Sequence, residues 1–99
     1  MTIQEQIWNY FKNKNFSEYG IAGIMGNIQK ESQFISNNVQ DTAPYSNSQY
    51  TSMVDNGNYN NFVDDGYGYG LVQWTYGPFK QDLLNRCRVA RKSISDINC

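Results

Sequence analysis

Apolar side chains recur at helical spacing in three parts of the chain, and capping or turn residues bound each part. The first part starts with the sequence TIQE at residues 2–5, which has the pattern of a capping box. Ile3, Ile7 and Phe11 follow on one helical face, and the polar sequence NKN at 13–15 ends the pattern. These features predict an amphipathic first helix.

A second helix is predicted between the N-cap residue Ser17 and about Gln33. Glycines recur at every third position along it, at Gly20, Gly23 and Gly26. Each glycine costs roughly 1 kcal/mol relative to alanine in a helix interior. We therefore expect another segment to approach the helix closely at these positions.

The middle of the chain, residues 36–61, is polar and rich in turn residues. Tyr50 to Val54 fit a short helical turn, and the sequence DNG at 55–57 is a strong turn signal. Long loops in small domains are usually functional or mobile. Residues 62–75 predict a glycine-rich turn that leads into a short extended or helical segment.

The third apolar pattern begins at Pro78, a residue that suits the first position of a helix. Phe79, Leu83 and Cys87 mark the stripe that we expect to be buried. The chain has no internal repeat. The fold class that follows is mainly α, a single small domain with one long polar loop.

The residue types that are missing narrow the chemistry. The chain has no histidine, which excludes Ser-His-Asp and Cys-His nucleophile pairs and zinc sites that contain histidine. Two cysteines alone cannot build a structural zinc site, so we expect no metal and no cofactor. Apart from lysine and tyrosine, carboxylates are the acid–base groups that remain, and reactions that need only carboxylates are chiefly glycoside hydrolyses.

Positive charge gathers near the end of the chain. Residues 80–92 carry five bases against one acid, although the net charge of the whole chain is −1. Such a run either contacts an anionic polymer or forms a solvated helix face. No nucleic-acid motif accompanies it, so nucleic acid is not an expected partner. The sequence also has no apolar run long enough to span a membrane and no apolar core of a signal peptide.

Glu31 is the leading candidate for a catalytic acid. Projected at about 100° per residue, it lies within roughly 60° of arc of Ile24 and Ile28. We therefore expect its carboxyl to be partly desolvated, and it lies near the negative end of the helix dipole. Both effects would raise its pKa above the reference of about 4.3 and favour a general acid. The alternative is an ordinary glutamate that tilts into solvent at a helix end.

Three aspartates could supply a second carboxylate: Asp55, Asp64 and Asp65. Asp65 is favoured because it precedes a glycine-rich turn that could present it at the edge of a cleft. The alternative is that Asp-Asp-Gly is simply a routine turn sequence.

Aromatic and amide side chains in the same segment suit a carbohydrate ligand. Tyr67, Tyr69 and Trp74 could stack on sugar rings, and Gln73 could bond hydroxyl or N-acetyl groups. For Trp74, a place in the core is an equally good interpretation.

Two motifs carry a resemblance to a known family. The sequences GIMGNIQKES and GYGLVQWT, found in this order, resemble those of phage tail lysozyme domains over about Ile7 to Ile97. More distantly, the chain is similar to goose-type lysozymes and lytic transglycosylases. Those proteins share a glutamate-serine pair at a helix end and a later glycine-rich segment with a glutamine.

The resemblance implies roles for individual residues. Glu31 matches the catalytic glutamate, Ser32 the serine that follows it, and Gln73 the glutamine of the cleft segment. Asp65 matches an aspartate before the Gly-Tyr-Gly-Leu run. The sequence departs from the family at 66–67, where small residues are usual. The turn there either has a different shape or lets Tyr67 add a sugar contact.

The resemblance further implies a lysozyme-like fold and a peptidoglycan glycan strand as substrate, cleaved at the β-1,4 bond between N-acetylmuramic acid and N-acetylglucosamine. Two alternatives stay open: a lytic transglycosylase, and a non-catalytic wall-binding structural module of the tail. The implied partners are other phage tail proteins or further domains of a longer parent chain.

The implied location is the virion tail, where the protein acts on the bacterial cell wall after synthesis in the host cytoplasm without a signal peptide. We expect one lysozyme-like domain over residues 1–99 that is shorter at its C-terminus than is usual in the family. Ser93 or Ser95 is predicted to cap one more helix that stops almost at once.

Overall fold

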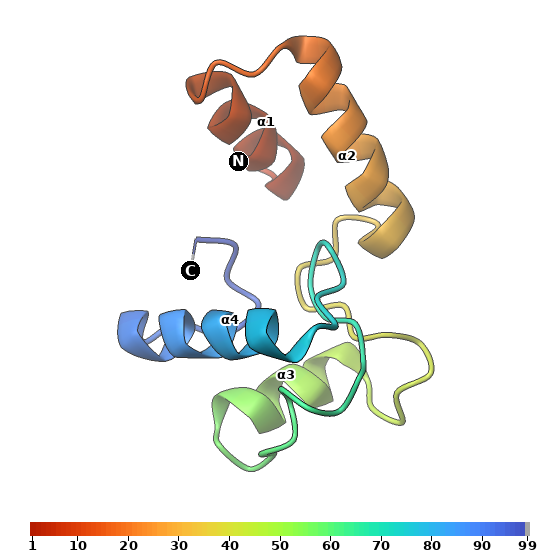
Figure 1. The fold of residues 1–99 in the computed structure, drawn as a ribbon, viewed down its shortest axis with the longest axis vertical. Coiled ribbons are helices and arrows are strands. Elements are labelled where there is room, and N and C mark those ends of the chain that lie inside the picture. Colours follow the sequence, from red (N-terminus) through yellow and green to blue (C-terminus); the bar gives the residue numbers. More distant parts are fainter. Residues whose placement is uncertain (99) are drawn as a thin grey trace.

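A computed structural model describes residues 1–98 of the protein, and these residues form four α-helices and no strand longer than an isolated bridge (Figure 1). The helices are α1 (Ile3–Asn13), α2 (Glu18–Ser32), α3 (Asn47–Asp55) and α4 (Gly77–Ala90). The prediction of a mainly helical small domain with a long polar connection is confirmed. No helix in the described part of the chain is long and apolar enough to cross a membrane.

The predicted caps of the first two helices are confirmed. The Thr2 hydroxyl accepts a hydrogen bond from the Glu5 amide at 3.1 Å, and the Glu5 carboxylate accepts one from the Thr2 amide at 3.2 Å. The Ser17 hydroxyl accepts from the amide of Gly20 at 3.0 Å. These bonds satisfy amide donors that a helix start leaves without intrahelical partners, which fixes where α1 and α2 begin.

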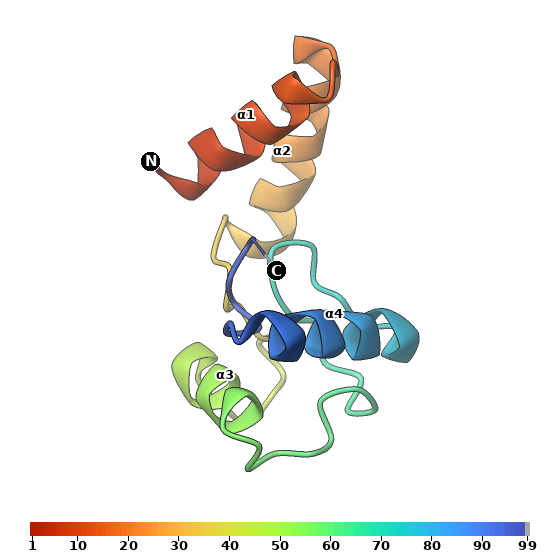
Figure 2. The same cartoon turned by 90° about the vertical axis from the view of Figure 1, so that its left-hand side faces the viewer.

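α1 and α2 form a helical hairpin that stands at one end of the molecule, and α3 and α4 lie at the other end (Figures 1 and 2). An ion pair of 3.2 Å between Lys12 and Glu18 spans the turn of the hairpin, where the rings of Phe11 and Phe16 also meet. α1 and α2 are the pair of helices whose backbones lie close together. α3 and α4 meet instead through the side chains of a shared core.

The polar middle of the chain holds more helix than predicted. The helical turn expected from Tyr50 to Val54 is confirmed but belongs to the longer helix α3, which begins after the cap residue Ser46. The DNG turn is also confirmed: α3 ends there, and Gly57 has a left-handed φ of 75°. Residues 62–75 contain no helix; Tyr69 forms isolated antiparallel bridges in this region.

The buried face of α4 differs from the predicted stripe. Phe79, expected in the core, is 54% exposed, and Leu83 is half-buried. Cys87 is buried as predicted, and the other buried residues of the helix are Lys80 and Leu84. The face is rotated because the Lys80 side chain reaches a buried carboxylate, an interaction that a search for apolar residues does not detect.

The expectation of a further helix after α4 is wrong for residues 93–98, which form turns. The amide of Ser95 donates to the hydroxyl of Ser93 at 3.1 Å, and the amide of Ile94 donates to Asp55 at 3.0 Å. These bonds attach the segment to the end of α3, and Ile94 enters the core.

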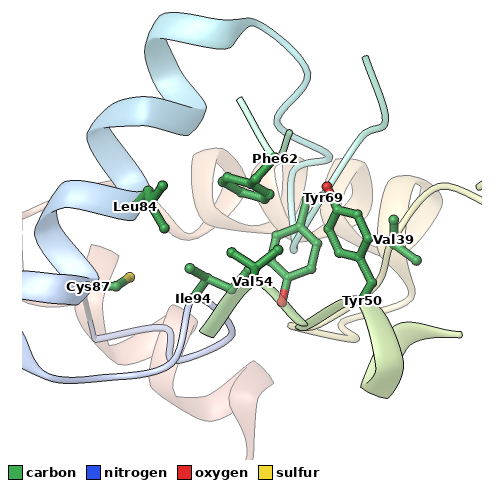
Figure 3. Packing of buried hydrophobic residues seen from close by; sticks show 8 residues of the cluster. All are labelled: Val39, Tyr50, Val54, Phe62, Tyr69, Leu84, Cys87 and Ile94. Carbon is green, nitrogen blue, oxygen red and sulfur yellow. The ribbon is translucent and has the colours of Figure 1, made fainter. Parts of the chain in front are cut away.

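The hydrophobic core joins α3, α4 and the segments around them (Figure 3). It contains Val39, Tyr50, Val54, Phe62, Tyr69, Leu84, Cys87 and Ile94. Much of the core volume is aromatic and carries hydroxyl groups, so this core has to satisfy polar atoms as well as bury apolar ones.

The expectation of close packing at the glycines of α2 is wrong for two of them. A Cβ added at Gly23 or Gly26 would meet nothing within 4 Å, and only at Gly20 does a side chain, that of Ser17, lie close. These glycines leave one side of α2 bare rather than admitting a neighbouring segment.

We expect Gly26→Ala to raise the free energy of unfolding by about 0.5–1 kcal/mol, because the new methyl meets no atom and alanine loses less backbone entropy. Gly66→Ala is the matched control: its surroundings are equally open, but its φ of 76° strains an L-residue. Urea unfolding of both variants checks this. Equal shifts in the two variants would contradict it.

Candidate active site

Glu31 lies in the last turn of α2, and its predicted burial is wrong: the residue is exposed. The buried face of the helix includes Ile28 and Ser32. Ser32 lies about 40° from Ile28 on one side of the helix, whereas Glu31 lies about 60° away on the other side. The apolar surroundings that the sequence predicted for this carboxyl are therefore absent from the free protein.

Ser32 does not present its hydroxyl to a ligand. The residue is 1% exposed, and its hydroxyl donates to the carbonyl of Ile28 at 3.1 Å. This structure therefore does not support the expected contact of Ser32 with substrate. A serine at this position instead lets a helix end pack closely while its polar atom stays satisfied.

The chain reverses sharply after Glu31 and brings the next segment to the glycine-rich region. Gln33 and Phe34 both have left-handed φ values, of 54° and 61°. Residues 36–40 then run beside residues 68–73, as the loop next to the end of α2 shows in Figures 1 and 2. Backbone bonds of 2.8 and 2.9 Å connect these two segments at Gly68 and Gly70.

Gln73 connects residues 36–40 to residues 68–73, and its side chain does not stand free in a cleft. Its side-chain amide donates to the carbonyl of Asn38 at 2.8 Å and to that of Gly70 at 2.9 Å, and its own φ is 52°. A Cβ at Gly68 would lie 2.8 Å from the amide oxygen of Gln73, so a larger residue there would displace this side chain. Gln73 is thus well placed to fix the shape of the segment that faces the end of α2.

Asp65 is buried in a network that uses its carboxylate fully. One oxygen accepts from the Lys80 ammonium at 2.7 Å and from the Tyr67 amide at 3.0 Å. The other accepts from the hydroxyl groups of Tyr50 and Tyr59, at 2.5 and 2.8 Å. A carboxylate offers about four acceptor positions, and these four donors occupy them. The geometry therefore does not favour Asp65 as the second catalytic carboxylate.

Burial and hydrogen bonding oppose each other in setting the charge of this network. Burial would raise the pKa of Asp65, but the hydrogen bonds that it accepts, led by that from Lys80, lower its pKa below the ordinary value of 3.8. Burial, followed by the bond to Asp65, raises the pKa of Tyr50 and Tyr59. The carboxylate therefore stays ionised and the two phenols stay protonated donors.

The two tyrosines expected to stack on sugars face inward to different degrees. Tyr69 is fully buried, and its hydroxyl shares a 2.6 Å hydrogen bond with that of Thr51, which leaves no ring surface for a ligand. Tyr67 is half-buried and packs against the core, and its carbonyl accepts from Lys80 at 2.9 Å. The expected contact of Tyr69 with substrate is wrong for this structure.

Trp74 is the predicted aromatic that remains accessible. It is 40% exposed and meets Phe79 edge to face, with ring centroids 5.5 Å apart. Both rings line a largely apolar cavity of about 450 Å³ that extends to Leu71 and Ile97. Glu31 lines neither this cavity nor the two smaller ones found in the described part of the chain.

Four residues that were not predicted as part of the site hold the predicted residues in place: Lys80, Tyr50, Tyr59 and Asn38. Only Lys80 carried a detectable signal: it lies four and seven positions before Leu84 and Cys87 and so shares their helix face. Within residues 1–98, no group of three or more potential ligands is arranged to hold a metal ion.

We predict that Lys80→Met lowers the free energy of unfolding by about 3–5 kcal/mol, because Asp65 would be left as an unpaired buried charge. Arg86→Met is the matched control on the same helix: its pair with Asp82 is more than 60% exposed and contributes at most about 1 kcal/mol. Urea unfolding measures both. Similar losses in the two variants would refute the central role of the buried pair.

Stability should also fall steeply in acid. The Asp65 carboxyl has a lower pKa in the folded protein than in the unfolded chain, so the unfolded chain binds the proton first as the pH falls. Its contribution is complete well above pH 3.8 and is lost as the pH drops below that value. Thermal unfolding of the parent and of Asp65→Asn across this range tests it: the Asn variant should be less stable near neutrality but lose less on acidification.

Comparison with known proteins supplies the family. A model of the phage tail lysozyme family matches residues 2–99, nearly the full length of the chain. Searches of curated proteins and of solved structures found no match. The two motifs therefore stand within a match that also covers the helices and the buried network, and the chain belongs to the phage tail lysozyme family.

Proposed function

We propose that this domain is a peptidoglycan glycosidase that cleaves the β-1,4 bond between N-acetylmuramic acid and N-acetylglucosamine, with Glu31 as the proton donor. The observation that carries the proposal is the position of Glu31, an accessible carboxyl at the end of α2. It lies in the motif GIMGNIQKES of a chain that belongs to a lysozyme family.

The end of α2 suits a general acid that meets a large polymer. A helix holds the Cα of Glu31 firmly, while the exposed side chain can reach the oxygen of a glycosidic bond. Because the protein does not bury the carboxyl, the bound glycan itself would exclude water from it. Proton transfer to the leaving oxygen would then be favoured only in the complex.

The segment across from α2 would provide the glycan with a fixed surface. Gln73 connects residues 68–73 to the chain that follows α2. The segment is therefore already ordered, and binding of the glycan would cost less conformational entropy. Next to it, the exposed ring of Trp74 offers an apolar face on which a sugar can stack. In this proposal Ser32 and Asp65 position the site, and Glu31 performs the chemistry.

The state of Asp65 supports a second candidate function, that of a lytic transglycosylase. A hydrolase that uses two carboxylates needs a second one free to activate water or to attack the sugar. The acceptor positions of Asp65 are occupied, although its neighbour Asp64 is exposed. In a transglycosylase the 6-hydroxyl of the muramic acid attacks its own anomeric carbon, and no second carboxylate is required.

The proposed setting is the virion tail acting on the bacterial cell wall. Membership of a phage tail lysozyme family supports this setting. In this setting the domain would contact other tail proteins or further domains of a longer chain.

We expect Glu31→Gln to lower the release of soluble fragments from purified peptidoglycan by about 10²- to 10⁴-fold, the usual contribution of a general acid. Folding should be unaffected because Glu31 is exposed. Glu18→Gln, which removes the same charge from the first turn of α2, is the control and should stay active.

The masses of the products then separate the two functions. A reducing end indicates hydrolysis, and a 1,6-anhydro end, lighter by one water, indicates transglycosylation. If the parent protein and both variants stay folded but release no fragments, the domain is a wall-binding module and the catalytic proposal fails.

A further inference from the structure

The structure divides the basic run at the end of the chain into residues with different surroundings. Lys80 is buried in its ion pair, and Arg86 pairs with Asp82 on the surface at 2.9 Å. The remaining bases of the run are Arg88, Arg91 and Lys92. Among residues 1–98, none of the ion pairs includes Arg88 or Arg91.

These three bases surround a cavity of about 380 Å³ at the C-terminal end of α4. Its apolar lining consists of the core residues Val54, Leu84, Cys87 and Ile94, which Figure 3 shows where α3, α4 and the final segment meet. Charged side chains thus stand around a base of buried core residues.

The lining of this cavity carries more positive than negative charge. Asp55 is the acid in its lining, and one of its carboxylate oxygens already accepts from the amide of Ile94 at 3.0 Å. Asp96, outside the lining, lies close enough to Lys92 to interact with its charge, so the excess of positive charge rests chiefly on Arg88 and Arg91. The dipole of α4 accounts for one base in its last turn, Arg88, but Arg91 and Lys92 lie beyond the last helical residue.

We propose that this basic cavity binds the phosphate groups of a phosphodiester-linked polymer carried by the bacterial cell wall. The assignment of the wall as partner rests on the proposed function. Arginine is the side chain best suited to phosphate, because its planar fork donates two parallel hydrogen bonds to two oxygens of one group. Both arginines line the cavity, Arg88 from the last turn of α4 and Arg91 from its C-cap.

The cavity suits a polymer with carbon units between its phosphates. The core residues at its base would contact carbon, and the surrounding cations would contact the charged groups on either side. Attachment here, at the C-terminal end of α4, would hold the domain on the wall while the C-terminal end of α2, on the other side of the molecule in Figure 1, meets the glycan.

The test measures binding of the full chain to purified cell walls and to the same walls stripped of phosphodiester polymers with cold hydrofluoric acid. The parent should bind intact walls at least about tenfold more tightly than stripped walls. The double variant Arg88→Gln/Arg91→Gln should lose this difference, and the salt dependence of its binding should fall by roughly one unit of slope per phosphate contact removed.

The matched control is Lys12→Gln/Lys14→Gln, which removes the same charge from α1, far from the cavity along the molecule (Figure 1). It should bind like the parent. Circular dichroism of both double variants confirms folding, which both should retain because all four bases are exposed.

Three results would overturn the proposal. If the arginine variant binds intact walls as tightly as the parent, the cavity has no part in binding. If binding survives stripping yet needs the arginines, the ligand is a carboxylate of the peptidoglycan. If duplex DNA displaces intact walls at lower concentration than soluble polyglycerol phosphate does, the site is one for nucleic acid. Fragment release from stripped walls tests the glycosidase by itself, so the two proposals can fail separately.

Discussion

The buried ion pair between Asp65 and Lys80 is the interaction on which the rest of the structure depends. The backbones of α3 and α4 do not come as close together as those of α1 and α2, and the two helices meet through the side chains of one core. The carboxylate of Asp65 accepts from Tyr50 on α3, from Lys80 on α4 and from the Tyr67 amide. Lys80 also lies 4.4 Å over the ring of Phe62. One charged pair thus connects two helices and the glycine-rich segment.

An ion pair of this kind is costly to bury, because both groups lose their hydration. Here the hydrogen-bonding capacity of both groups is nearly filled: four donors surround the carboxylate, and the ammonium also donates to the carbonyl of Tyr67. No buried side-chain polar atom among the described residues lacks a hydrogen-bond partner. Because these bonds have fixed directions, the network specifies one arrangement of an aromatic core that apolar contacts alone would fix less sharply.

The structure separates two kinds of carboxylate that look alike in sequence. Asp65 is ionised, enclosed and fully used, whereas Glu31 is exposed at the end of a helix. The first stabilises the segment that faces α2, and the second is free to react. The surface also separates into a face near α2 and Trp74, which we assign to the glycan, and a basic cavity at the end of α4. In these proposals, the buried network stabilises a fold that meets one cell wall at two separate sites.

The sequence by itself determined the features that depend on neighbouring residues. The capping box at Thr2, the cap at Ser17 and the turn at Gly57 were predicted and are present, because each depends on hydrogen bonds or φ angles within a few residues. The two family motifs also follow from sequence alone. The tertiary structure decided which side chains are buried: Lys80 faces inward where Phe79 was expected, and Glu31 faces solvent beside a buried Ser32. Those outcomes depend on partners far away in the chain, such as Asp65 for Lys80. Helical periodicity gives no information on where a distant carboxylate lies.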